Sequence, residues 1–348
     1  MTFPRRIDLR SDTVTQPDEA MRVAMSAAEV GDDVLDHDPT MRRLEQEAAA
    51  LLGMGAALWV PSGTMGNLIA LMHHLERGDR YLAPRAAHVL EAELGSGAWL
   101  AGGMPQPLEW SGGPGRVSPE DLRTHLGGGA PYYALRTRLL CLENTHNFAG
   151  GAVTPPDEHA KLVALAAEAG LRVHLDGARL WNASVALGVP PAALTVGVDT
   201  VQVCLSKGLG APVGSLVCGS ELFIAQARRL RKMLGGGVRQ GGVLAAAGLL
   251  ALGRIPELAT DHANATALAD GLAELGWQVG KPETNIVIAA VPDTGYALAG
   301  LDKLGVAAVA VPGGVRFVTH RDVSAADIAE VLDRIRSAAE RSAAVTAG

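Results

Sequence analysis

Leu205-Ser206-Lys207-Gly208-Leu209-Gly210 is the stretch that decides the fold, because a lysine stands there between an apolar run and a glycine-rich bend. The residues before it, among them Val201 and Val203, have the apolar character of a buried β-strand. At the end of such a strand, burial favours the neutral, nucleophilic form of an amine. The pattern is typical of a Schiff-base lysine, although a lysine that simply reaches into solvent would look the same.

Strands alternate with helices on both sides of this lysine, which predicts an α/β fold with mostly parallel strands. Strands are predicted at 57–60, 80–82, 139–142, 171–175 and 201–205, with a returning strand at 214–218. Helices are predicted at 17–29, 40–52, 156–169 and 221–234, and a surface excursion at 102–130. Ligands of such sheets bind beyond the carboxyl ends of the strands, so we expect Ser62, Glu143 and Asp176 beside Lys207.

The length of 348 residues is suited to a large domain and a smaller one. We predict an extended N-terminal arm over 1–20, a large domain over 21–250 and a small C-terminal α/β domain over 251–348. Within the small domain, helices are predicted at 256–275, 294–304 and 325–344, and strands at 285–290 and 315–319. The polar arm is expected to lie against the body of the chain or against another subunit.

Charge and composition narrow the class of protein. The 30 basic and 37 acidic residues give a formal charge of −7 without a basic run, which argues against nucleic acid or an anionic membrane as a partner. No apolar stretch reaches about 18 residues free of charges and breakers, so no membrane span is expected. Cys141, Cys204 and Cys218 lie in apolar runs and indicate buried thiols in a reducing compartment. A cytoplasmic protein is therefore predicted.

Ser62-Gly63-Thr64 follows a predicted strand and opens a helix. Helix N-termini present unpaired N–H groups and the positive end of a dipole, so this turn could cradle a phosphate. An ordinary helix cap would use the same residue types. A phosphate turn, an amine such as Lys207 and a carboxylate such as Asp176 are together what pyridoxal phosphate requires, the carboxylate serving its ring nitrogen.

Other histidines offer weaker patterns. A metal site built from His73, His74 or His146 is a remote alternative, because no ligand spacing supports it, and no metal is predicted. His88 taken alone would more often be a structural histidine.

Seven blocks of the chain resemble the L-threonine aldolase family. They are 8–15, 61–67, 142–147, 174–179, 206–215, 231–240 and 316–320. The blocks follow the family's order over nearly the whole chain. The resemblance implies a fold-type I pyridoxal-phosphate enzyme that cleaves L-threonine or L-allo-threonine to glycine and acetaldehyde. It also implies a homo-oligomer, a tetramer built from dimers whose two subunits share their active sites.

The resemblance assigns roles residue by residue. Lys207 would carry the cofactor, Asp176 would pair with its ring nitrogen, and His88 would stack on its ring. The implied phosphate and ring contacts come from Ser62, Gly63, Thr64 and Arg179, with Lys232 and Arg239 supplied by a neighbouring subunit. The implied substrate contacts come from Ser11, Arg179, Arg316 and Tyr133. His88, alone or through a water held with Glu93, is our candidate base for the β-hydroxyl proton.

The chain departs from the family's pattern near the substrate. Leu35 and the following Asp36-His37 replace a tyrosine and Gly-Glu, and Tyr133 or its neighbour Tyr132 stands where many members carry a histidine. These differences bear on which residue is the catalytic base and on the preference between L-threonine and L-allo-threonine as substrate. The nearest alternative is a fold-type I β-eliminating lyase acting on another amino acid, which would release ammonia. A non-catalytic cofactor-binding protein is a second alternative, against which the carboxylate-gripping Ser11 and Arg316 argue.

Overall fold

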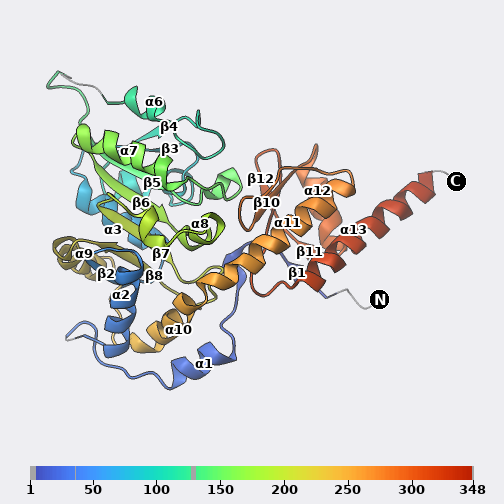
Figure 1. Cartoon of the computed structure of the whole chain (residues 1–348), viewed down its shortest axis with the longest axis horizontal. Coiled ribbons are helices and arrows are strands. Elements are labelled where there is room, and N and C mark those ends of the chain that lie inside the picture. Colours follow the sequence, from blue (N-terminus) through green and yellow to red (C-terminus); the bar gives the residue numbers. More distant parts are fainter. Residues whose placement is uncertain (1–4, 36, 127–130, 347–348) are drawn as a thin grey trace.

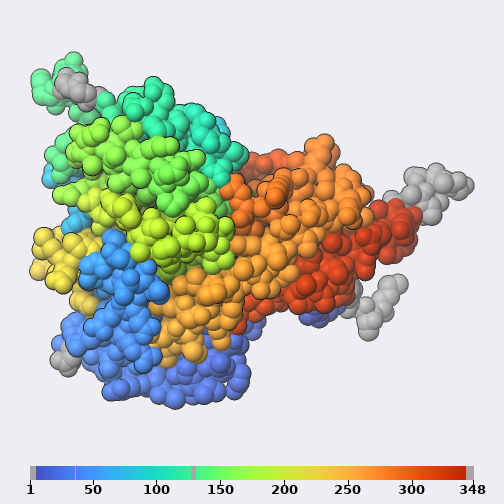
Figure 2. Space-filling view, viewed as in Figure 1, coloured from blue at the N-terminus to red at the C-terminus, as the bar shows by residue number. Residues whose placement is uncertain are grey.

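A computed structural model describes residues 5–35, 37–126 and 131–346. The chain forms two lobes, a large one around a seven-stranded sheet and a small one around a four-stranded sheet (Figure 1). Helix α11 (Leu258–Glu274) runs from the large lobe into the small one. In the space-filling view, α10 (Gly242–Gly253) and α11 form one continuous band across the face shown (Figure 2).

The large sheet has the strand order β2-β8-β7-β6-β5-β3-β4. Its strands are β2 (Ala56–Val60), β3 (Arg80–Pro84), β4 (Met104–Leu108), β5 (Thr137–Glu143), β6 (Arg172–Gly177), β7 (Thr200–Cys204) and β8 (Ser215–Gly219). Strand β8 runs antiparallel to both of its neighbours, and the other neighbouring pairs are parallel. The predicted α/β class with a mostly parallel central sheet is therefore confirmed.

Helices cover this sheet, and its central strands are buried. The helices of the large lobe, besides α10, are α1 (Glu19–Ser26), α2 (Pro39–Leu51), α3 (Gly63–His74), α4 (His88–Glu91), α5 (Ser96–Trp99), α6 (Pro119–Arg123), α7 (Pro156–Glu168), α8 (Leu180–Leu187) and α9 (Glu221–Met233). Strand β7 is buried along its whole length and β6 from Val173 onward, so their polar residues His174, Asp176, Thr200 and Gln202 are buried as well.

The predicted surface excursion at 102–130 was wrong in part, because it contains β4 and α6. Strand β4 pairs only with β3 and forms an edge of the sheet. Its sequence includes Pro105 and Pro107, which cannot donate to a ladder and are tolerated only at such an edge. These prolines are the reason why the sequence did not predict this strand.

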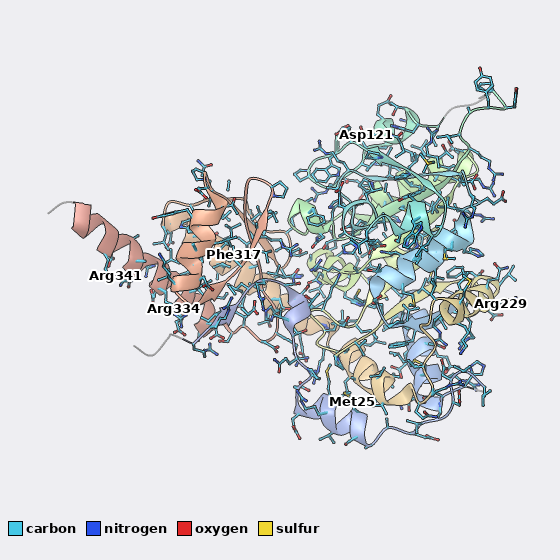
Figure 3. All side chains as sticks on the ribbon, turned by 180° about the vertical axis from the view of Figure 1, so that it is seen from behind. Met25, Asp121, Arg229, Phe317, Arg334 and Arg341 are labelled. Atoms are coloured by element: carbon cyan, nitrogen blue, oxygen red, sulfur yellow. The ribbon has the colours of Figure 1, made fainter. Side chains whose placement is uncertain are left out.

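The small lobe is built on an antiparallel sheet of order β12-β13-β10-β9. Its strands are β9 (Gln278–Val279), β10 (Ile286–Ala290), β12 (Val309–Val311) and β13 (Gly314–Val318), and its helices besides α11 are α12 (Thr294–Lys303) and α13 (Ala325–Thr346). Phe317 of β13 lies in the core of this lobe, while Arg334 and Arg341 lie along α13 (Figure 3). The small C-terminal domain of helices and strands that the sequence predicted thus has an antiparallel sheet.

The N-terminal arm packs against the body of its own chain. Strand β1 (Ile7–Asp8) pairs in parallel with β11 (Val306–Ala307), and Ile7 and Leu9 enter the core of the small lobe. The core of the large lobe extends to Leu258, and that of the small lobe resumes at Ala265. The change from one core to the other therefore falls within α11, later than the predicted boundary at 250. Residues 1–4 of the predicted arm lie outside the described residues.

Among the described helices, no single one is long and apolar enough to cross a membrane. One bent pair, 242–253 with 255–274, meets the length and composition criteria only when the two are taken together.

Candidate active site

The parallel strands deliver the predicted side chains to one edge of the large sheet. Ser62 follows β2, Asp176 lies near the end of β6, and Lys207 follows β7 by three residues. The turn at Lys207 is held by the arm, because Thr15 Oγ1 donates to the Lys207 carbonyl oxygen at 2.8 Å. Lys207 is half-buried, and its charge acts on both Asp12 and His88.

Asp176 is a buried carboxylate, with only 2% of the residue exposed. Its Oδ2 accepts from Asn67 Nδ2 at 2.8 Å, and its Oδ1 accepts from the Ala178 N–H at 3.1 Å. Within the described part of the chain, no lysine or arginine forms an ion pair with it. A buried carboxylate without a cation is costly, and the protonated ring nitrogen of pyridoxal phosphate would provide one. The residues at this edge therefore fit that cofactor.

His88 and Glu93 form a hydrogen-bonded pair beside Asp176. The distance from His88 Nδ1 to Glu93 Oε1 is 2.8 Å. The backbone N–H of His88 donates to Glu143 Oε2 at 2.7 Å. Burial opposes a charged imidazole, but the bond to Glu93 and the charges of Asp176 and Glu93 outweigh it and raise the pKa of His88. Burial also raises the pKa of Glu93, which the hydrogen bond from His88 offsets only in part.

The turn after β2 opens helix α3. Ser62 is its N-cap, since its Oγ accepts from the Met65 N–H at 3.2 Å. The N–H groups of Gly63 and Thr64 have no acceptor among the described residues, as expected of a turn that can take an anion. A Cβ at Gly63 would come within 3.0 Å of Cys204 Sγ, so this glycine also lets α3 approach β7.

Two arginines meet at Asn147. Arg179 Nη1 and Arg316 Nη1 donate to the same Asn147 Oδ1, at 2.9 and 3.0 Å. Arg179 is further bound by Asp12, with two contacts of 2.7 Å. This guanidinium holds the pKa of Asp12 well below its usual range, despite the opposing effect of burial.

Arg316 is less fully paired than Arg179. Its buried Nε has no hydrogen-bond partner among the described residues, and its only other contact is a 3.5 Å approach to the Arg10 carbonyl oxygen. Burial and the charge of Arg179 lower the pKa of Arg316 to about 10, still high enough for it to remain a cation at neutral pH. Arg316 is thus the arginine that can accept a further anion, whereas Arg179 is already occupied. Ser11 lies in the same arm as Asp12, and its Oγ accepts from Thr13.

Tyr133 lies far from the site of its own chain. The expected contact between Tyr133 and a substrate bound in that same chain is therefore wrong. It precedes β5 and is 78% exposed, at the amino edge of the sheet, opposite the edge that carries Lys207. Leu35 is 77% exposed, and Asp36 lies outside the described residues.

Lys232 and Arg239 are exposed and are not brought to the site of their own chain. Arg239 pairs there with Asp32 at 3.3 Å. Among the described residues, the one group of His, Cys, Asp and Glu side chains close enough to share a metal ion is His88, Glu93 and Asp176. It does not include His73, His74 or His146.

The sequence did not predict several residues of the site. Asp12, Asn67 and Asn147 lie inside the family-like blocks, but nothing in their own sequence indicated a role. Their partners lie far along the chain, as Asp12 with Arg179 and Asn67 with Asp176 show. Asn67 and Asn147 lie in segments that follow predicted strands, which is the one signal that pointed to them, whereas Asp12 lies in the arm and had no such signal.

Comparisons with known proteins agree with this geometry. The family model described as beta-eliminating lyase matches residues 8–294. Low-specificity L-threonine aldolase 1 of Arabidopsis thaliana is 42% identical over 347 residues, covering 96% of each chain. Low specificity L-threonine aldolase of Escherichia coli K12 is 43% identical over 334 residues, covering 95% of this chain and 98% of the relative.

Solved structures share the fold. The Leishmania major threonine aldolase structure aligns with a TM-score of 0.83 at 19% identity, covering 96% of this chain and 99% of that one. Sphingomonas wittichii serine palmitoyltransferase aligns with a TM-score of 0.77 at 19% identity, covering 97% and 88%. The fold is thus that of the fold-type I pyridoxal-phosphate enzymes. The chain belongs to the beta-eliminating lyase family and, within it, to the low-specificity L-threonine aldolases.

Proposed function

We propose that this protein is a pyridoxal-phosphate-dependent aldolase that cleaves L-threonine, L-allo-threonine and related β-hydroxy-α-amino acids to glycine and an aldehyde. The observation that carries the proposal is the open guanidinium of Arg316, which reaches from β13 of the small lobe to Asn147, close to the sheet edge that carries Asp176 and Lys207. A clamp for a carboxylate beside a cofactor site is what an amino-acid substrate requires. A protein that only binds the cofactor has no use for it.

The residues that would hold pyridoxal phosphate are Lys207 for its aldehyde carbon, Asp176 for its ring nitrogen, and the turn at Ser62-Gly63-Thr64 for its phosphate. When bound, the cofactor supplies the electron sink for the electron pair released when the Cα–Cβ bond breaks. Asp176 is held by Asn67 and the Ala178 N–H, so it can keep the ring nitrogen protonated without turning away.

The side chains divide the remaining work. Arg316 binds the substrate carboxylate and orients the amino acid, so that the Cα–Cβ bond is the one that breaks. His88 takes the proton of the β-hydroxyl group as the bond breaks. The hydrogen bond from His88 Nδ1 to Glu93 fixes the ring and leaves Nε2 as the proton acceptor.

The rival reaction is β-elimination, and the products separate the two. Wild-type protein should be yellow and should convert L-threonine or L-allo-threonine to glycine and acetaldehyde, measured separately from ammonia. Lys207→Ala should lose both the visible absorbance and turnover, because the amine that attaches the cofactor is gone. Ammonia without acetaldehyde would refute the aldolase assignment in favour of a lyase.

The proposal extends to a cytoplasmic homotetramer built from dimers, in which Lys232 and Arg239 serve the cofactor phosphate of a neighbouring subunit. Lys232 lies in the last turn of α9 and Arg239 in the loop that follows, and both are exposed, so another chain can reach them.

Replacement of Arg239 tests this shared site. Arg239→Ala should weaken cofactor retention about tenfold in the assembled protein, since a charged hydrogen bond to phosphate is lost. Dialysis of the loaded protein followed by its visible absorbance measures retention, with oligomeric state checked by light scattering. Arg336→Ala, at an exposed arginine of α13, is the control. Wild-type retention in an intact Arg239→Ala oligomer would show that the assignment between subunits is wrong.

A further inference from the structure

A line of buried hydrogen bonds lies behind Asp176, between α3 and strands β6 and β7. His74 Nε2 lies 3.0 Å from Thr200 Oγ1, which lies 2.9 Å from His174 Nδ1. His174 Nε2 then lies 3.0 Å from Asn67 Oδ1. Asn67 and His74 are about two turns apart and so share one face of α3. His174 and Thr200 are paired neighbours on the two strands.

The partners of Asn67 fix the direction of these bonds. Its Nδ2 donates to both Asp176 Oδ2 and Glu93 Oε1, each at 2.8 Å. The opposite orientation of the amide would set its oxygen against two carboxylates, so Oδ1 must face His174. His174 Nε2 therefore carries a proton and donates it to Asn67.

The same reasoning continues along the line. Burial lowers the pKa of His174 to about 4, so the ring is neutral and its Nδ1 must accept from the Thr200 hydroxyl. With its only hydrogen given to His174, Thr200 Oγ1 accepts from His74 Nε2. His74 is neutral as well, since burial lowers its pKa to about 2, and its ring stacks against Phe223. Every donor in the line thus points toward the two carboxylates, and such bonds strengthen one another.

Two carboxylates this close need a donor between them. The ligand atoms of Asp176, Glu93 and His88 all lie within 4.8 Å of one another. Like charges at such a distance repel, and without a shared donor the side chains would turn apart or take up a proton. The Asn67 amide meets this need, because a single NH₂ group serves both acids.

We propose that Asn67 is a positioning residue, oriented by the line His74–Thr200–His174, that sets the placement of Asp176 and Glu93 at the cofactor site. The inference rests on the proposed function for what the two carboxylates do there. The hydrogen bonds that carry it are independent of the reaction.

Thr200 is the place to test the line. Thr200→Val removes one hydroxyl from a buried strand residue and keeps a β-branched shape suited to β7. His174 Nδ1 then loses its donor, and the bond from His174 Nε2 to Asn67 Oδ1, which the Thr200 hydroxyl polarises, becomes weaker. The dissociation constant for pyridoxal phosphate, from absorbance titration, should rise about fivefold to tenfold, and kcat should fall by a similar factor. KM for L-threonine should change less than about twofold, because Arg316 binds outside the line.

Two controls separate positioning from general damage. Thr200→Ser keeps the hydroxyl and should restore cofactor affinity. Thr195→Val removes another buried hydroxyl, which donates to the Leu52 carbonyl oxygen at 2.6 Å, and should lower the thermal midpoint alone. If Thr200→Val does not fold, His74→Phe breaks the line at its far end while keeping a ring against Phe223, with an expected loss of affinity of about twofold to threefold.

The inference is overturned if the line-breaking variant binds cofactor and turns over as Thr195→Val does, or if Thr200→Ser loses as much as Thr200→Val. Failure of the proposed function would look different. Wild-type protein would then bind pyridoxal phosphate without cleaving threonine, and the comparison of cofactor affinities would still decide the role of Asn67.

Discussion

At the scale of single residues, His88 and Glu93 set the pH at which the site can take up a proton. A base works in its neutral form, and the pKa of His88 is raised by its bond to Glu93 and by nearby negative charge, against the effect of burial. Activity should therefore fall as the pH drops through a value above about 6.5, the ordinary pKa of histidine.

Replacement of Glu93 should change the pH at which activity falls. Glu93→Gln removes the negative charge and the charged hydrogen bond that raise the pKa of His88, so the acidic limb of kcat/KM should shift to lower pH. Activity at high pH should also drop, because His88 is less firmly oriented. Glu91→Gln makes the same change of charge at an exposed position of α4 and should leave the limb in place. An unshifted limb in Glu93→Gln would exclude His88 as the base.

At the scale of elements, the close approach of α3 to β7 places both the phosphate turn and Asn67. Gly66 permits this approach, since a Cβ there would come within 2.6 Å of Gln202 Cγ. Gln202 is fully buried, so it has little room to move.

Gly66→Ala should therefore be destabilising although alanine favours helix. Overpacking of this kind costs about 1–3 kcal/mol, more than the gain in helix propensity. Gly300→Ala is the control, because Gly300 lies in α12 with open space around its position and should gain about 0.5–1 kcal/mol. Urea unfolding of both variants measures the change. Equal stabilisation by the two alanines would mean that α3 does not touch β7 closely.

The sequence predicted those elements whose local pattern of apolar and polar residues is distinctive. Lys207 and Asp176 were located from apolar strands followed by polar residues, and the parallel sheet brings them to one edge. Contacts between distant segments carry no local pattern, which is why the bonds of Asn67 to Asp176 and of Asp12 to Arg179 were not foreseen. Tyr133 was assigned from the resemblance alone, and because it precedes β5 it lies at the edge of its own sheet opposite the residues that follow the strands.

At the scale of the whole molecule, Asp12 joins the two lobes. It pairs with Arg179 of the large lobe and accepts from Asn285 Nδ2 of the small lobe at 3.2 Å. Both members of the ion pair are buried, with exposed side-chain fractions of 5% for Arg179 and 0% for Asp12.

Asp12→Asn should be severely destabilising, by about 3–5 kcal/mol at neutral pH, because Arg179 would be left as a buried cation without its partner. The folded pKa of Asp12 is depressed, so its contribution is present above the unfolded value of about 3.9 and is lost as pH falls through the folded value. The difference in unfolding free energy from wild type should therefore shrink below about pH 4.

Asp8→Asn supplies the control for this prediction. Asp8 lies in the same arm and pairs with the exposed Arg10, so its replacement should cost less than about 1 kcal/mol. Denaturant unfolding across the acidic range measures both variants. An Asp12→Asn protein as stable as Asp8→Asn would mean that the arm does not join the lobes.

The attachment of the arm also orders events during synthesis. Ile7 and Asp8 are translated before every strand of the large sheet, yet their partners Val306 and Ala307 are translated after all of them. The carbonyl oxygen of Leu9 likewise accepts from the N–H of Val318, at 2.8 Å, and Val318 is translated later still. The nascent chain must therefore carry an undocked N-terminus while the whole large sheet is translated. The arm that carries Asp12 to Arg179 is anchored only after β11 and β13 are made, so the site for an amino acid is completed after the large lobe has been translated.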